Sequence, residues 1–148
     1  MSVQRRILMS AALALAVLAT GCATVNKATP EADASAKTFR ANPAVSQVYI
    51  YRNEVLGAAL SMPVTVNGKL IGTTGAKTFF KVDLPAGKHT LTSQGETSKL
   101  DLVTETGKLY FVWQEVKMGG FSGGSKLQLV SEAVGKQGVQ ECTLAQAQ

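Results

Sequence analysis

From Val45 onward, the sequence consists of short segments in which apolar and polar residues alternate, and this pattern most limits the folds open to the chain. Successive side chains of a strand point to opposite faces, so such alternation is typical of strands with one buried face. Seven or eight short strand-like segments, most of them alternating, follow one another: 48–51, 63–66, 69–72, 78–84, 88–92, 98–104, 109–113 and 126–130. Turn residues separate most of them at intervals of roughly 8–12 residues, which predicts an all-β sandwich or small barrel.

Two details of this pattern refine the prediction. Asn67 and Gly68 join two alternating segments, and this pair favours a two-residue hairpin because a type I′ turn requires positive φ at both central residues. Segments 48–51 and 109–113 are apolar on both faces, which is typical of strands inside a sheet. The expected fold is a small immunoglobulin-like or prealbumin-like β-sandwich.

The beginning of the chain has the three parts of a secretory signal. Arg5 and Arg6 supply positive charge, and residues 7–19 form an uncharged apolar run. The sequence Leu-Ala-Thr-Gly-Cys at 18–22 then resembles the lipobox of bacterial lipoproteins, in which the cysteine is lipidated and becomes the mature N-terminus. The resemblance implies a signal peptide over residues 1–21 and lipidation at Cys22.

Cys22 suits this modification because a thiolate is the side-chain nucleophile that accepts a diacylglyceryl group as a thioether. The alternatives are an ordinary residue after a plain signal peptide and a retained membrane anchor, although 7–19 is shorter than the about 20 apolar residues that a spanning helix needs. Ala23 stands where an aspartate favours inner-membrane retention in enterobacteria. By that resemblance, the expected location is the outer membrane, facing the periplasm.

The remaining chain divides into two parts by composition. Residues 22–43 are polar and alanine-rich, and are expected to form a lipid-anchored tether with one short helix that starts at 29–31. Residues 44–148 are expected to form the β-sandwich domain. Near its end, a short helix is expected over 131–137, capped by its first serine and interrupted by Gly135.

The charge of the chain argues against a nucleic-acid-binding protein, and its cysteine content argues against an internal disulfide. The 148-residue chain has a net charge of +5, which falls to +3 without Arg5 and Arg6. The rest is spread over isolated lysines without a basic cluster, so no nucleic-acid partner is expected. With Cys22 lipidated, Cys142 has no partner for an internal disulfide. It is expected to be a small buried residue rather than a reactive thiol.

The order of motifs resembles a family of uncharacterised bacterial lipoproteins, the domain-of-unknown-function family numbered 2846. The shared motifs are a Tyr-x-Tyr-Arg strand at 49–52, an Asn-Gly hairpin at 67–68 and a Pro-x-Gly-x-His turn at 85–89. The likeness covers about 37–142. The hairpin and the turn also resemble PEGA modules, small β domains of bacterial surface proteins. The resemblance implies a β fold and an envelope location, and it supplies no activity.

Groups for catalysis are sparse. A hydrolase needs a nucleophile, a base and an orienting group, and His89 is the one base candidate; a hydrogen bond to the backbone is its simpler role. The ten acids are scattered, and one histidine with one further cysteine makes no zinc site. The loop 119–124 lacks the Gly-Lys-Ser/Thr ending of a phosphate loop, and is expected to be a flexible hairpin or a contact surface. No enzyme activity, metal or cofactor is expected, other than covalent lipid on Cys22.

Five residues are candidates for ligand binding, and His89 is one of them. Arg52 ends an apolar strand, and either pairs with Glu54 or another acid or binds an anionic envelope component. Tyr49, Tyr51 and Trp113 are either core residues or a platform for stacking sugars.

The expected function is that of a non-enzymatic, lipid-anchored periplasmic module that binds or scaffolds an envelope component. A module that binds carbohydrate or peptidoglycan is the alternative, and a periplasmic enzyme is the third. The expected partners are membrane lipid, through the anchor, and an envelope protein or glycan.

Overall fold

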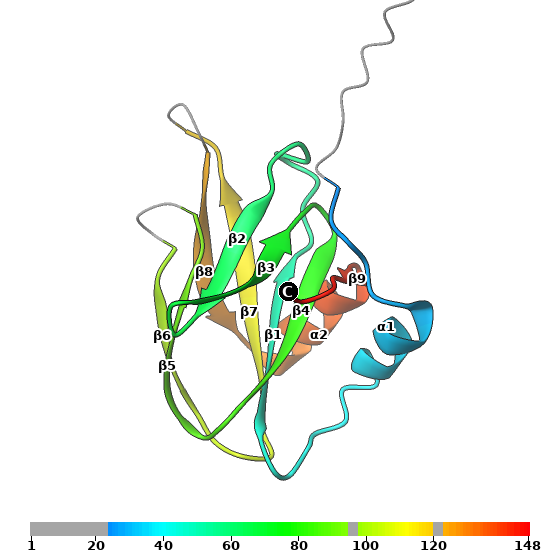
Figure 1. The fold of residues 1–148 in the computed structure, drawn as a ribbon, viewed down its shortest axis with the longest axis vertical. Helices are drawn as coiled ribbons and strands as arrows, with labels where there is room; N and C mark the ends of the chain where they lie inside the picture. Colours follow the sequence, from blue (N-terminus) through cyan, green and yellow to red (C-terminus); the bar gives the residue numbers. More distant parts are fainter. Residues whose placement is uncertain (1–23, 95–97, 120–122) are drawn as a thin grey trace, which may run out of the picture.

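Two β-sheets pack face to face, and two short helices lie against the outer face of the larger sheet (Figure 1). The computed structural model describes residues 24–94, 98–119 and 123–148. The larger sheet has the order β8-β7-β1-β4-β9, and the smaller has the order β3-β2-β5-β6. The elements are α1 (Pro30–Ala36), β1 (Ser46–Arg52), β2 (Met62–Val66), β3 (Lys69–Thr74), β4 (Thr78–Leu84), β5 (Gly87–Thr92), β6 (Leu100–Thr104), β7 (Leu109–Lys117), β8 (Gly124–Val130), α2 (Glu132–Gln140) and β9 (Thr143–Leu144). The predicted all-β sandwich is confirmed, and the described residues form nine strands rather than seven or eight.

Strand β1 lies at the centre of the larger sheet and is buried along its whole length. It pairs antiparallel with β4 and parallel with β7, so that Ile50 lies opposite both Phe80 and Val112. A strand covered on both faces needs apolar residues at successive positions, which explains why segment 48–51 does not alternate. The prediction that this segment and 109–113 form interior strands is confirmed.

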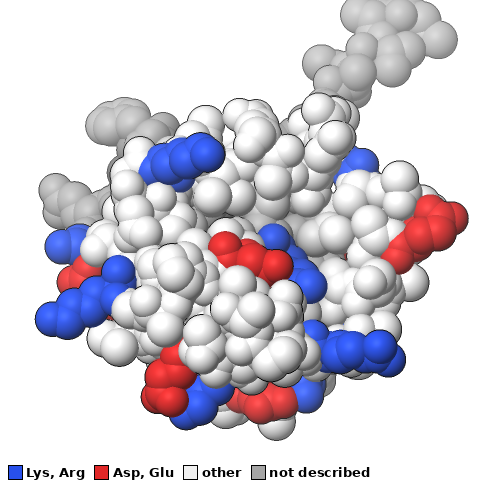
Figure 2. Space-filling model, turned by 60° about the horizontal axis from the view of Figure 1, so that its bottom comes forward, with Lys and Arg blue, Asp and Glu red and all other residues white. Residues whose placement is uncertain are grey.

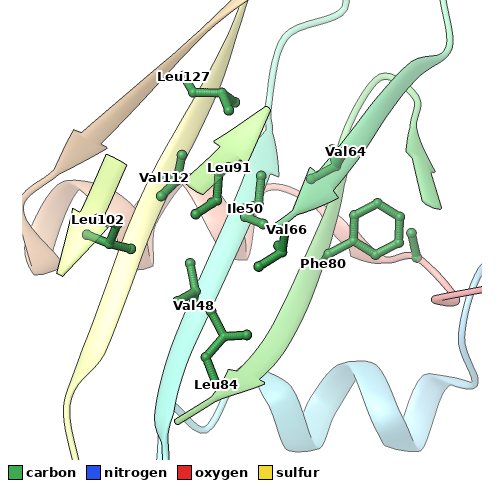
Figure 3. Close-up of a cluster of buried hydrophobic side chains, with 11 residues drawn as sticks. Val48, Ile50, Val64, Val66, Phe80, Leu84, Leu91, Leu102, Val112 and Leu127 are labelled. Carbon is green, nitrogen blue, oxygen red and sulfur yellow. The ribbon is translucent and has the colours of Figure 1, made fainter. Parts of the chain in front are cut away.

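The main hydrophobic core fills the space between the two sheets (Figure 3). Strands β1, β2 and β4 each contribute two residues from their inner faces, at even spacing as the period-two pattern predicts, and β5 to β8 contribute one each. The core residues are Val48, Ile50, Val64, Val66, Phe80, Leu84, Leu91, Leu102, Val112, Leu127 and Ala145.

The hairpin between β2 and β3 forms where the sequence predicts it. Asn67 and Gly68 have φ values of 51° and 79°, the positive values that a type I′ turn requires at both positions. The turn fixes the register of these two strands, and the rest of the smaller sheet is built on β2 through its pairing with β5.

Helix α2 continues through Gly135 for nine residues instead of being interrupted there. Ser131 caps it as expected, because its hydroxyl accepts a hydrogen bond from the Val134 N–H. Gly135 and Gly138 are both buried and face the larger sheet, close to the rings of Phe111 and Tyr51. These glycines allow the helix backbone to approach the sheet without side chains between them.

The segment expected to be a tether packs onto the domain from residue 24 onward. Thr29 caps α1 as predicted, and the carboxylate of Asp33 accepts a hydrogen bond of 2.7 Å from the Leu144 N–H. Ala36 is buried, and its carbonyl accepts a hydrogen bond from the Tyr49 hydroxyl. In the structure this segment therefore lies against the domain, and its few apolar residues complete the cover of the outer sheet face.

Candidate functional site

The residue with the clearest sequence signal, Cys22, lies outside the described residues, as does the whole expected signal peptide. Part of the glycine-rich loop 119–124 also lies outside them. Within the described residues, no helix is both long and apolar enough to cross a membrane.

His89 on β5 is bound on both ring nitrogens within the domain. Its Nε2 donates to the Pro85 carbonyl at 2.8 Å, and its Nδ1 accepts from the Asn67 side-chain amide at 2.9 Å. The orientation of Asn67 is set by its own oxygen, which accepts from the Thr90 N–H. The imidazole therefore links the hairpin turn to the Pro-x-Gly-x-His turn. With both nitrogens engaged, the structural role of His89 is the one that the geometry supports.

Arg52 is completely buried at the end of β1. Its guanidinium donates to the carbonyls of Leu60 and Gly57, each at 2.7 Å, and more weakly to the Leu56 carbonyl at 3.4 Å. Burial lowers its pKa, and the nearby charge of Glu54 opposes that shift. Arg52 is thus not a surface site for anions.

Arg52 does not form the expected ion pair with Glu54, because each side chain binds backbone atoms instead. The Glu54 carboxylate accepts a hydrogen bond of 2.8 Å from the Val116 N–H, while Arg52 binds backbone carbonyls. Together these two side chains fix the loop that joins β1 to β2. Sequence reasoning did not reach this role because the acceptors are backbone atoms, which no side-chain pattern reveals.

The three candidate aromatic residues do not form one exposed platform. Tyr49 is completely buried and stacks on Phe111, with ring centroids 5.1 Å apart. Tyr51 is buried as well, and burial raises the pKa of each tyrosine to about 12. Trp113 is half-buried. The core interpretation therefore holds for both tyrosines, and Trp113 alone is partly open to a ligand.

A shallow pocket of about 280 Å³ lies where β1 and β7 meet α2. Its wall combines aromatic, amide and acidic side chains: Tyr51, Asn53, Trp113, Val134, Gln137, Gly138 and Glu141. Asn53 and Lys77 both bind the carboxylate of Glu141, at 3.1 Å and 3.3 Å. The indole N–H of Trp113 is buried with no hydrogen-bond partner among the described residues. The pocket is small for a ligand site and offers polar hydrogen bonding beside one aromatic ring.

Sequence reasoning named two residues of this pocket and missed its polar ones. Tyr51 and Trp113 were candidates, whereas Asn53, Gln137 and Glu141 were not. Their separation along the chain explains the omission, since nothing in the local pattern brings α2 to this face of the sheet.

Two further features bear on possible chemistry. The described residues contain no cluster of histidine, cysteine, aspartate or glutamate able to hold a metal ion. The Cys142 thiol is buried, and burial raises its pKa to about 12. It donates to the carbonyls of Gly138 and Arg52, as expected of a small buried residue.

Comparison with known proteins gives the family. The sequence model of the family described as protein of unknown function (DUF2846) matches residues 43–125. The chain belongs to the DUF2846 family. An uncharacterized protein of Haemophilus influenzae is 38% identical to it over 136 residues, which cover 90% of this chain and 81% of the relative. No solved structure gives a significant match.

The DUF2846 match covers β1 to the beginning of β8. It therefore contains the internal bonds of Arg52, Asn67 and His89. Helix α2, and with it one wall of the pocket, follows the matched segment.

Proposed function

We propose that this DUF2846 protein is a non-enzymatic, lipid-anchored module of the bacterial envelope that binds or scaffolds another envelope component from the periplasmic side of the outer membrane. The observation that carries the proposal is the order of a charged start, an apolar run and a lipobox that ends at Cys22. Val25, three residues later, already packs against the core of the domain. A non-catalytic role agrees with His89, whose two ring nitrogens are already bound inside the domain.

Lipid on Cys22 would hold the domain at a membrane permanently. Each buried methylene contributes about 0.8 kcal/mol, and two acyl chains are enough for stable anchoring. The folded sandwich would then be the part that meets a partner.

Replacement of Cys22 by alanine is expected to abolish lipid attachment. Cells that express the wild-type chain and are fed an alkyne analogue of palmitate should yield a labelled protein in the membrane fraction, while Cys22→Ala should be unlabelled. The Cys142→Ala variant is the matched control, and it should label like the wild type because its thiol is buried. An unlabelled wild-type protein would contradict the proposal. Crosslinking and pull-down with the same wild-type and Cys22→Ala proteins would then identify the partner.

A glycan-binding module is the second candidate, and the pocket beside α2 favours it. Half-buried Trp113 stands there beside the amides of Asn53 and Gln137, a combination suited to a sugar ring and its hydroxyls. We expect the protein to co-sediment with purified peptidoglycan sacculi, and Trp113→Ala to reduce the bound fraction at least three-fold. Val103→Ala, at an exposed position outside the pocket, is the control. Sedimentation that is equal for both variants, or absent for all, would exclude this candidate.

A further inference from the structure

The distance between the expected lipid and the folded domain is very short. Val25 already packs against the core between the sheets, and it follows Cys22 by three residues. Three extended residues span at most about 11 Å. A domain anchored at Cys22 therefore has one end held against the membrane, instead of moving freely on a tether.

The end that faces the membrane is defined by the neighbours of Val25. Thr24 and Val25 line a hollow together with Ala58 of the β1–β2 loop and Gly75 of the β3–β4 turn. Figure 1 shows the first described residues at the top of the domain, beside the loop that joins β1 to β2. This loop and the anchor therefore lie at the same end of the sandwich.

That loop exposes large apolar side chains. Val55 is 67% exposed and Leu56 is 55% exposed. Met118, also exposed, lies beside Gly57, the next residue of the loop, since its sulfur is 3.5 Å from the position that a side-chain carbon on Gly57 would occupy. Contiguous exposed apolar residues mark interaction surfaces more often than isolated ones do.

The loop is presented as a fixed surface. Arg52 binds the carbonyls of Leu56, Gly57 and Leu60 from inside the domain, which ties the backbone down while the side chains of Val55 and Leu56 remain outside. Because its backbone is already fixed, such a loop loses little conformational entropy when its side chains bind to another surface.

The opposite end of the molecule has a different character. Figure 2, in which the bottom of Figure 1 is turned forward, shows basic and acidic side chains interspersed on that surface. Arg40, Lys81 and Asp83 line a hollow there. Such a surface favours water over lipid.

From this arrangement we propose that the apolar end formed by Val55, Leu56 and Met118 docks onto the phospholipid surface that holds the anchor, with these side chains entering the boundary between headgroups and acyl chains. The proposal rests on the lipid anchor of the proposed function and adds an orientation to it. The sandwich stands with the β1–β2 loop on the membrane and its charged end in the periplasm. The exposed Lys27, next to the same hollow, lies where it meets anionic headgroups.

The test compares two valines of nearly equal exposure. Val55 is 67% exposed at the membrane end, and Val103 is 64% exposed on β6. Mature lipidated Val55→Cys and Val103→Cys proteins are labelled with an environment-sensitive fluorophore and reconstituted into phosphatidylethanolamine/phosphatidylglycerol vesicles. Cys142 stays unlabelled, because it is buried with its pKa raised to about 12.

We expect the probe at position 55 to shift to the blue and to be quenched by doxyl-labelled lipids at least three-fold more than the probe at position 103. A Leu56→Glu substitution should bring the quenching at position 55 down to the level at position 103. Leu129→Glu, at a residue 52% exposed on β8, should not. If both labelled proteins float with the vesicles and are quenched equally, docking is overturned while the anchor stands. If neither floats, the anchor is overturned, and docking with it.

Discussion

Replacement of Gly135 by alanine is expected to lower the free energy of unfolding by about 2–3 kcal/mol. An added Cβ would lie 2.1 Å from the Cβ of Phe111 and 2.2 Å from its Cγ. A Cβ is fixed to its backbone, so a change of rotamer cannot remove this overlap, and α2 must move away from β7. Equilibrium denaturation in urea, followed by tryptophan fluorescence, measures the loss.

The sign of this effect makes the test informative. In a helix without tertiary contacts, alanine is more favourable than glycine by about 1 kcal/mol, so helix propensity alone predicts stabilisation. Gly119→Ala is the control, because no atom lies within 4 Å of the added Cβ. It should change stability by less than about 0.5 kcal/mol. If Gly135→Ala is as stable as the wild type or more so, the close packing of α2 on the sheet is wrong.

Replacement of Arg52 by methionine is expected to cost about 3–5 kcal/mol, because three backbone carbonyls lose their donor inside the protein. Methionine approximates the length of the side chain, so the lost hydrogen bonds dominate over the lost volume. Burial of the positive charge is unfavourable, as the lowered pKa of Arg52 indicates. The neutral methionine avoids this cost, which offsets part of the loss in stability. Urea denaturation gives the total effect, and hydrogen exchange should show faster exchange in the segment 54–61.

Arg40→Met is the matched control, since Arg40 is exposed. It should stay within about 0.5 kcal/mol of the wild type. Equal stability of the two methionine variants would mean that Arg52 does not hold the loop. In the lipidated protein, Arg52→Met should also weaken the quenching of a probe at position 55, because the loop is then no longer presented in one conformation.

The strands were predictable because their signal is local. Alternation over 78–84 and the Asn67-Gly68 pair depend on neighbouring residues, and both give the observed structure. The parallel pairing of β1 with β7 was not predictable, since it joins segments about sixty residues apart. The cover of the outer face was missed for a different reason. The segment 24–43 is mostly polar, and only Ala36 and Phe39 from it pack into the outer cluster.

The candidate residues were found by type, and their roles depend on contacts across the chain. The sequence marks Asn67 and His89 as members of two turns, but the hydrogen bond between them spans 22 residues. Arg52 shows the same limit, because a charged side chain at a strand end is equally consistent with a surface site and a buried support. The pocket beside α2 contains both kinds of residue: Tyr51 and Trp113, which the sequence marks as candidates, and polar residues that no sequence pattern marks.

Backbone hydrogen bonds join the first and last described segments of the domain. The Ala28 N–H donates to the Leu144 carbonyl at 2.9 Å, and the Gln146 N–H donates to the Asn26 carbonyl at 2.8 Å. For a chain that crosses a membrane from its N-terminus, these bonds form only after residue 146 has emerged. In a chain exported in this way, as we propose, the contact between residues 26–28 and 144–146 would be the last part of the described domain to form.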